Sequence, residues 1–304
     1  MSHNTSWSRR DAIRLALAAG LAPHFAFAED GMITRPIPAS TESLPVIGLG
    51  TWPVFDVEST PEEIGRSRRI VEALVDAGGT LIDTSPMYNR SEKVIGDVIE
   101  AGVGRRRLFL ATKVWTDGKA AGEAQMRRSA ELMNTEVIDL MQVHNRRDLD
   151  VHMATIRDWQ EAGKIRYNGV TDYRESAHDE MAEVMRRHRP QFIQINYSLG
   201  EHAADEDVLP MARDTGVAVL INRPFMSGRL FRAVRDRDLP DWADEFADSW
   251  AQFFLKFIVS HPAVTCVIPA TSDPAHMADN LGAGSGVLPD AATRRRMIEF
   301  IGDV

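Results

Sequence analysis

The sequence contains a single cysteine, Cys266, among its 304 residues, so the chain cannot form an internal disulfide. It also lacks an uninterrupted apolar run of about 18 residues, which excludes a membrane-spanning helix in the mature protein. The net charge of −9 disfavours nucleic acid as a partner. The hydrophobic content of 44% is nevertheless ample for a large core.

Two common sequence motifs are missing as well. No G-x-G-x-x-G follows a predicted strand, which argues against an open, doubly wound nucleotide-binding sheet. The nine histidines include no H-E-x-x-H and no comparable cluster, so we expect no metal site.

The first 28 residues have the layout of an export signal. A polar, positively charged start carries SRRDAI at 8–13, an apolar segment follows, and small residues flank Phe27 at the end. The paired arginines before the apolar segment resemble a twin-arginine signal, so we expect the export machinery as a partner and a periplasmic or otherwise exported mature protein. Folding before export would fit the absence of a disulfide. The alternative is a short basic amphipathic arm.

Residues 81–144 contain the most informative pattern in the chain. Three short apolar runs each end in a polar residue, namely Asp83, Lys113 and His144, and Tyr88 follows the first run. Short apolar runs that alternate with longer amphipathic segments indicate parallel strands joined by helices. Because parallel strands point the same way, we expect these four side chains to meet at one end of a sheet.

These residue types together suit one kind of chemistry. A phenol has a pKa near about 10, and a neighbouring ammonium group lowers that value by favouring the phenolate. We therefore expect Lys113 to tune Tyr88, Asp83 to keep Lys113 charged, and His144 to orient a substrate oxygen. Such a set fits the reduction of an aldehyde or ketone, in which Tyr88 donates a proton to the carbonyl oxygen.

The order of these residues resembles the aldo-keto reductase family, and further motifs extend the resemblance in the family's order. The motifs that carry it are IGLGTW at 47–52, DTSPMY at 83–88, ATKVW at 111–115, QVHN at 142–145, GVTDY at 169–173, QINYS at 194–198 and IPATSDPAHMADN at 268–280. The resemblance implies a nicotinamide-dependent oxidoreductase that interconverts a carbonyl and an alcohol. Asp83, Tyr88, Lys113 and His144 would be its catalytic residues.

Eight strand–helix pairs favour a single-domain α/β protein, a (β/α)8 TIM barrel spanning 46–304, after a linker and barrel-bottom segment at 29–45. We expect a short hairpin or irregular lid in that segment. The expected strands are 44–52, 80–84, 107–112, 137–143, 165–171, 191–196, 217–222 and 264–268. The expected helices start at Pro61 and then cover 92–101, 121–134, 150–162, 175–188, 205–215 and 242–260, with a long loop at 223–241, a short helix from Pro274 and a last helix at 289–301.

The resemblance also implies a set of binding residues. Those for the cofactor are Thr51, Thr171, Asp172, Gln194, Arg223, Phe225, Ser227, Thr271, Ser272, His276 and Asn280, and those for the substrate are Trp52 and Trp115. Two aromatic walls would favour a substrate with an apolar or flat portion.

Some of these positions depart from the family pattern. Thr171 and Asp172 stand where the family commonly has Ser-Asn on the nicotinamide carboxamide, and Asn222 and Arg223 stand where many members offer a stacking tyrosine. We hypothesise that Asp172 accepts from the carboxamide and that its charge favours the oxidised cofactor. Arg223 would stack on the nicotinamide ring or form a salt bridge at the barrel rim.

Further departures leave the cofactor open between NADPH and NADH. Ala270 and His276 replace the lysine and arginine that grip the phosphate of NADPH in the family. Two other functions also remain open: a non-catalytic nicotinamide-binding module that senses redox state or binds a partner, and a barrel hydrolase that uses Asp83 and Asp172 as paired carboxylates. We expect a monomer that acts on a small carbonyl or alcohol.

Overall fold

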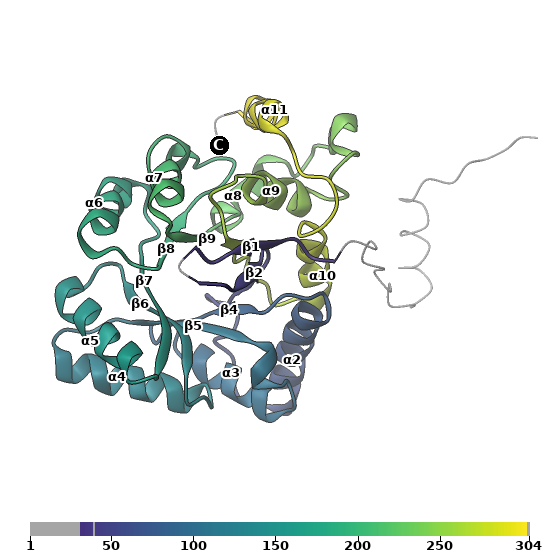
Figure 1. Ribbon diagram of the computed structural model, residues 1–304. Coiled ribbons are helices and arrows are strands. Elements are labelled where there is room, and N and C mark those ends of the chain that lie inside the picture. The colour runs from purple at the N-terminus through teal and green to yellow at the C-terminus, as the bar shows by residue number, and fades with distance from the viewer. Residues whose placement is uncertain (1–30, 39, 303–304) are drawn as a thin grey trace, which may run out of the picture.

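The computed structural model describes residues 31–38 and 40–302, in which eight parallel strands form one sheet in chain order. Figure 1 shows the strands arranged around a common centre, with helices outside them. The strands are β3 (Leu49–Gly50), β4 (Leu81–Asp83), β5 (Phe109–Val114), β6 (Ile138–His144), β7 (Ile165–Thr171), β8 (Phe192–Asn196), β9 (Ala218–Asn222) and β10 (Cys266–Val267). Parallel bridges from Ile47 to Val267 and from Gly50 to Ala270 join the two edges, so the sheet closes as a (β/α)8 barrel, as predicted.

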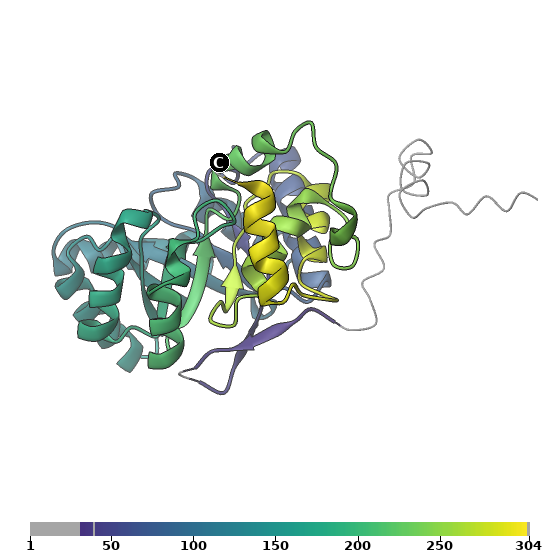
Figure 2. The ribbon, with the colours of Figure 1, turned by 90° about the horizontal axis from the view of Figure 1, so that it is seen from above.

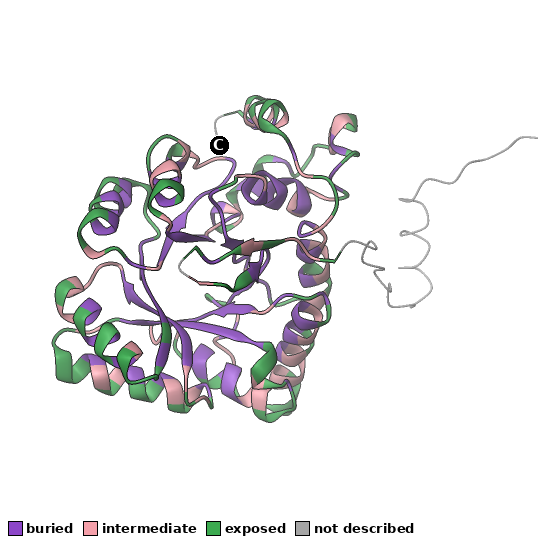
Figure 3. Ribbon diagram, in the orientation of Figure 1, coloured by how far each residue is buried: buried purple, intermediate pink, exposed green. Residues whose placement is uncertain are grey.

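The helices turn their buried sides toward the strands (Figure 3). They are α2 (Pro61–Asp76), α3 (Ser91–Glu100), α4 (Lys119–Leu132), α5 (Leu149–Glu161), α6 (His178–His188), α7 (Val208–Thr215), α8 (Arg229–Ala233), α9 (Trp250–Val259), α10 (Pro274–Gly282) and α11 (Ala291–Ile301). The first of them begins as the sequence predicts. The Thr60 hydroxyl accepts from the Glu63 N–H, and Pro61 occupies the first turn, where its missing N–H costs no hydrogen bond.

A two-stranded hairpin closes the amino-terminal end of the barrel, where the sequence predicts a short hairpin or irregular lid. It consists of β1 (Thr34–Pro36) and β2 (Ser43–Pro45), and it crosses the barrel in Figure 1 and projects from one end in Figure 2. Its Ile37 and Leu44 pack against Phe109, Tyr167 and other buried side chains of the strands. These apolar contacts cover the amino-terminal end of the barrel, and in (β/α)8 enzymes the active site lies at the opposite, carboxyl-terminal end.

Three predicted elements differ from the structure. The strand predicted at 44–52 is divided between the hairpin strand β2, which ends at Pro45, and the short barrel strand β3 at Leu49–Gly50. The helix predicted at 242–260 begins only at Trp250, because the Ser249 hydroxyl caps it by accepting from the Gln252 N–H at 3.1 Å. The loop predicted at 223–241 contains the short helix α8. Apolar spacing extends past Ser249 in both directions, so periodicity by itself did not reveal the capped start.

The predicted export signal at 1–28 lies outside the described residues, so its role stays a prediction. Among residues 31–38 and 40–302, no helix has the length and apolar character needed to cross a membrane.

Candidate active site

A buried ion pair lies at the carboxyl ends of β4 and β5. The Lys113 ammonium is 2.6 Å from Asp83 Oδ2, and it also donates to the Thr84 carbonyl at 2.6 Å. Burial alone would lower the pKa of Lys113, but Asp83 and Tyr88 outweigh it and raise that pKa above its ordinary value. Lys113 therefore stays charged although its side chain has no exposed surface.

Two glutamines complete the environment of Asp83. Gln142 Nε2 and Gln194 Nε2 donate to Asp83 Oδ1 at 3.0 and 2.8 Å, from β6 and β8. Thr51 adds a further link, because its hydroxyl donates to the Asp83 carbonyl at 3.0 Å. The carboxylate itself is held by Lys113, Gln142 and Gln194, which come from β5, β6 and β8. Its position follows from the barrel and not from the local sequence.

Tyr88 lies on the loop between β4 and α3, with Lys113 Nζ 5.0 Å from its ring centroid. A turn fixes the loop: the Tyr88 N–H donates to the Ser85 carbonyl at 2.9 Å, and the Ser91 hydroxyl donates to the Tyr88 carbonyl at 2.8 Å. The expectation of a lowered pKa for Tyr88 is wrong in its net direction. Burial raises that pKa more than Lys113 lowers it, so the phenol keeps its proton.

His144 ends β6 and is buried beside the Tyr88 ring, with the two ring centroids 6.0 Å apart. Burial and the charge of Lys113 lower the pKa of His144 to about 3, so the imidazole is neutral at physiological pH. Its Nδ1 lies 3.0 Å from the Ser85 hydroxyl, whose oxygen already accepts from the Met87 N–H at 3.1 Å. The Ser85 hydroxyl hydrogen is free to donate to Nδ1, and in that tautomer the imidazole proton is on Nε2.

Both predicted substrate residues are exposed at this end of the barrel. Trp52 follows β3, is 54% exposed and packs on Tyr88 with the ring centroids 5.2 Å apart. Trp115 follows β5 and is 36% exposed.

Asp172, after β7, is only 1% exposed and is paired with two arginines. Arg146 donates to its Oδ2 at 2.6 Å, and Arg174 donates to both carboxylate oxygens at 3.0 and 2.8 Å. The Arg174 N–H adds a bond to Oδ1 at 3.0 Å. Burial would raise the pKa of Asp172, but these partners lower it below its ordinary value. With its oxygens occupied, the carboxylate does not fit the hypothesis that it accepts from a carboxamide.

The neighbouring polar residues form a second cluster. The Thr171 hydroxyl donates to Gln194 Oε1 at 3.1 Å, and Asn222 Nδ2 lies 3.4 Å from the same oxygen. Within residues 31–38 and 40–302, several buried polar atoms after the strands have no hydrogen-bond partner. They are Thr84 Oγ1, Asn145 Oδ1, His202 Nδ1, Asn222 Oδ1 and Arg223 Nε. Buried polar atoms normally find partners, so these atoms leave hydrogen-bonding capacity unused.

The loop after β9 places Arg223 above the Tyr173 ring at 5.6 Å and 4.0 Å from the Glu201 carboxylate. The salt bridge considered for Arg223 is therefore present, although long. Further along, Phe225 packs on Phe231 with ring centroids 4.8 Å apart, and Ser227 has a left-handed backbone with φ 53°.

The predicted residues for the distal end of the cofactor lie just before α10 and along it. Thr271 and Asn280 are buried, and Ser272 and His276 are exposed. Asp273 caps the helix by accepting from the Ala275 N–H at 2.8 Å.

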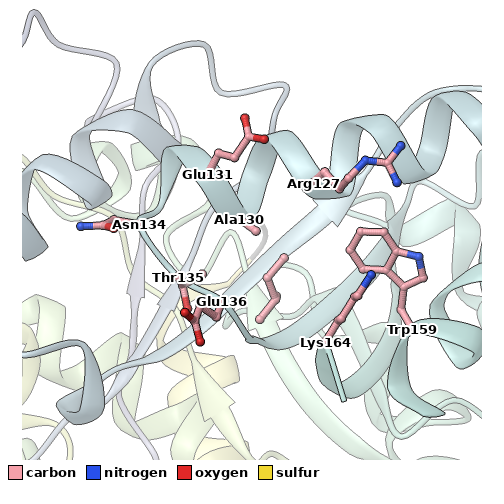
Figure 4. A pocket seen from close by; sticks show the side chains of 9 residues that line it. Arg127, Ala130, Glu131, Asn134, Thr135, Glu136, Trp159 and Lys164 are labelled. Atoms are coloured by element: carbon pink, nitrogen blue, oxygen red, sulfur yellow. The ribbon is translucent and has the colours of Figure 1, made fainter. Parts of the chain in front are cut away.

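Two surface hollows lie away from these residues. One of about 380 Å³ lies at the opposite end of the barrel, between Trp159, Lys164 and the loop before β6 (Figure 4). Another, of about 340 Å³, lies beside Trp242 and Leu288. Neither includes Asp83, Tyr88, Lys113 or His144. In the part of the chain that the structure describes, no cluster of three or more histidine, cysteine or acidic residues could hold a metal ion.

Sequence reasoning missed several residues that shape this site, above all Ser85, Gln142, Arg146 and Arg174. Ser85 and Gln142 stand inside motifs that were recognised, DTSPMY and QVHN, so their place beside Asp83 and His144 was a usable signal. Arg146 and Arg174 sit in loops, where no periodicity indicates a partner.

Asp83, Tyr88, Lys113 and His144 therefore lie close together at the carboxyl ends of the strands of a (β/α)8 barrel. The sequence profile of the aldo/keto reductase family matches residues 46–295, and the chain belongs to this family. It is an enzyme of the aldo-keto reductase type.

Relatives and solved structures agree with this assignment. Methylglyoxal reductase YeaE of Escherichia coli is 30% identical over 78% of this chain and 84% of its own length. Aldo-keto reductase YhdN of Bacillus subtilis is 31% identical over 60% of this chain, and the match spans 59% of that protein. An aldo/keto reductase from Klebsiella pneumoniae, solved with NADP and acetate, superposes with a TM-score of 0.70 at 22% identity, over 86% of this chain and 93% of the other.

Proposed function

We propose that this enzyme reduces an aldehyde or ketone to an alcohol, or performs the reverse reaction, with Tyr88 as the general acid or base. The observation that carries the proposal is the buried Asp83–Lys113 pair beneath Tyr88, with a neutral His144 next to it. In this arrangement Tyr88 can donate a proton to a substrate oxygen that His144 holds by a hydrogen bond.

The chain's own groups divide the work as follows. His144 Nε2–H donates a hydrogen bond to the substrate oxygen, because Nδ1 is engaged with Ser85. Tyr88 then donates its proton to that oxygen, and the Lys113 ammonium stabilises the phenolate that forms. Asp83 keeps Lys113 charged and fixed in place. A nicotinamide, when bound, supplies the hydride that reaches the carbonyl carbon.

The residues present fit a nicotinamide dinucleotide. Asn222 Nδ2 lies 3.4 Å from Gln194 Oε1, which also accepts from the Thr171 hydroxyl, and Asn222 Oδ1 and the adjacent Arg223 Nε have no partner, so donors and acceptors for a carboxamide are at hand. Arg223 also offers a positive charge for a phosphate, since its contact with Glu201 is long at 4.0 Å. The structural neighbour from Klebsiella pneumoniae contains NADP, which supports the same class of cofactor here.

The residues expected at the adenosine end of the cofactor leave the choice between NADPH and NADH open. The segment 268–280 carries neither lysine nor arginine, and Asp273 occupies the start of α10. A ribose 2′-phosphate prefers fixed positive charge, so we propose that the enzyme accepts NADH at least as well as NADPH.

Direct titration tests this proposal. Residues 29–304 are mixed separately with NADPH and NADH while reduced-nicotinamide fluorescence is followed, and we expect micromolar binding of at least one. Turnover of methylglyoxal, the substrate in the name of the relative YeaE, then separates an enzyme from a binding module. If neither cofactor binds, the nicotinamide mechanism is wrong.

The hydrolase alternative finds little support in the site. Asp83 is held by Lys113 and two glutamines, and Asp172 by two arginines, so neither carboxylate is available as an acid or base. Activity without any dinucleotide would reverse this judgement.

We also propose that the mature protein is exported, on the strength of SRRDAI and the small-residue ending before Glu29. Fractionation of cells that express the full chain tests this. Replacing Arg9 and Arg10 with lysine should retain the precursor inside the cell.

A further inference from the structure

The loop between β6 and α5 adopts a costly backbone conformation directly after His144. Asn145, Arg146 and Asp148 have φ values of 51°, 59° and 49°, in the left-handed region that side chains with a Cβ rarely adopt. Such strain persists only where surrounding contacts hold it. The contacts here come from two adjacent arginines that reach in opposite directions.

Arg146 reaches toward the β7 side of the barrel. Its guanidinium donates to Asp172 at 2.6 Å and lies 3.0 Å from the Glu180 carboxylate. Arg147 reaches toward the β5 side. It donates to both oxygens of Asp117, at 2.9 and 2.6 Å, and its guanidinium carbon lies 4.7 Å from the centroid of the Trp115 ring.

The loop that carries Trp115 is fastened at further points. Gln125 accepts from the Trp115 N–H at 2.6 Å, and Asp148 accepts from the Gly118 N–H at 2.7 Å. The buried His152 binds the Thr116 carbonyl through Nε2 at 2.8 Å. The backbone of Trp115 is therefore fixed, and the Arg147 guanidinium lies over its indole.

We propose that Arg147 is a specificity-determining positioning residue that holds the Trp115 indole as a fixed wall beside the reacting groups. Trp115 comes two residues after Lys113, and Arg147 comes three residues after His144. Substrates with a flat apolar group are favoured, because such a group packs on the fixed indole while the carbonyl faces Tyr88. The inference rests on the proposed carbonyl chemistry and names the part of the substrate that is selected.

Arg147 does not act as a binding site for an anionic substrate. Its charge is balanced by the bidentate pair with Asp117, and its planar face is used by the indole. Selection should therefore follow the shape of the substrate and not its charge.

The test compares a flat aldehyde with a small one in wild type and Arg147→Ala, with the full mature chain and the better cofactor. For 4-nitrobenzaldehyde we expect KM to rise about fivefold to tenfold with kcat nearly unchanged. For methylglyoxal both constants should stay within about twofold. Asp117→Ala removes the partner of Arg147 and leaves Trp115 itself unchanged. It should also raise KM for 4-nitrobenzaldehyde relative to KM for methylglyoxal.

Arg187→Ala is the matched control, since Arg187 forms an exposed ion pair with Asp150 at 3.0 Å. It should leave the ratio of the KM values for the two aldehydes unchanged. An equal loss for both aldehydes in Arg147→Ala would show a merely structural role and overturn the proposal, as would no change for either.

A binding measurement separates this inference from the proposed function. Nitrobenzaldehyde quenches tryptophan fluorescence, so its Kd can be measured without turnover, with Trp115→Phe identifying the responsive indole. If wild type reduces no carbonyl, the proposed function fails, and a weaker Kd in Arg147→Ala still supports the role of Arg147. An unchanged Kd refutes it.

Discussion

Lys113 Nζ lies 2.6 Å from Asp83 Oδ2, and both side chains are buried at the junction of β4 and β5. Breaking such a pair leaves one charge uncompensated, so Lys113→Met should destabilise the protein by about 3–5 kcal/mol as well as abolish turnover. Urea denaturation measures the first effect. Asp83→Asn combined with Lys113→Met should recover part of the loss, because no unpaired charge remains.

Lys119→Met provides the comparison for that experiment. Lys119 pairs with Asp158 at 2.7 Å, but both side chains are more than half exposed. Its loss should leave the free energy of unfolding nearly unchanged, because exposed ion pairs contribute little. An equal loss of stability in Lys113→Met and Lys119→Met would show that burial does not make the Asp83–Lys113 pair more stabilising than an exposed pair.

Tyr88→Phe should lower kcat by about 10²–10⁴-fold while cofactor affinity stays within a few-fold, because only the proton donor is removed. Steady-state kinetics and fluorescence titration measure the two quantities. Tyr173→Phe is the control, since Tyr173 is 46% exposed at the same end of the barrel and lies under Arg223. Turnover retained in Tyr88→Phe would remove Tyr88 from its role.

His144 should impose a pH dependence on stability. Its pKa is about 3 in the folded protein against 6.5 as the ordinary value, so below pH 6.5 the unfolded chain binds a proton that the folded chain does not. Stability is fully present above pH 6.5 and is lost as the pH falls toward 3. Between pH 8 and pH 5 the wild type should lose about 2 kcal/mol more than His144→Gln.

Chemical denaturation at the two pH values measures that difference. His261, whose pKa burial lowers to about 4, changes stability in the same direction but is present in both proteins and cancels. The kcat/KM profile of the wild type should also show no inflection near 6.5. An inflection there that disappears in His144→Gln would contradict a neutral His144.

Asp172→Asn tests whether this carboxylate affects cofactor binding or the stability of the barrel. Because Arg146 and Arg174 neutralise it, we expect the ratio of the Kd values for oxidised and reduced cofactor to change by less than about twofold. Stability should fall by about 1–3 kcal/mol, since the hydrogen bonds from the two arginines to this buried side chain weaken. A large change in the ratio, with unchanged stability, would restore the hypothesis that Asp172 favours the oxidised cofactor.

Much of the architecture could be predicted because strands and helices have distinct apolar periods. The runs ending in Asp83, Lys113 and His144 identify neighbouring parallel strands, and parallel strands bring their carboxyl ends together. The start of α9 could not be predicted in this way, because the Ser249 cap lies inside a longer apolar pattern.

Ionisation states and partners across the barrel depend on packing, which the linear sequence does not show. The net effect on the pKa of Tyr88 depends on how deeply the ring is buried, and burial outweighs Lys113. The pairing of Asp172 with Arg146 depends on the left-handed turn after His144.

By itself, the sequence determined the class of fold, the family and the four residues that meet at one end of the barrel, since each depends on strand period and motif order. Only the tertiary structure decided that His144 is neutral, that Asp172 is paired with Arg146 and that Arg147 packs on Trp115. These properties arise from desolvation and from contacts between loops that are far apart in the chain, and both exist only once the barrel has closed.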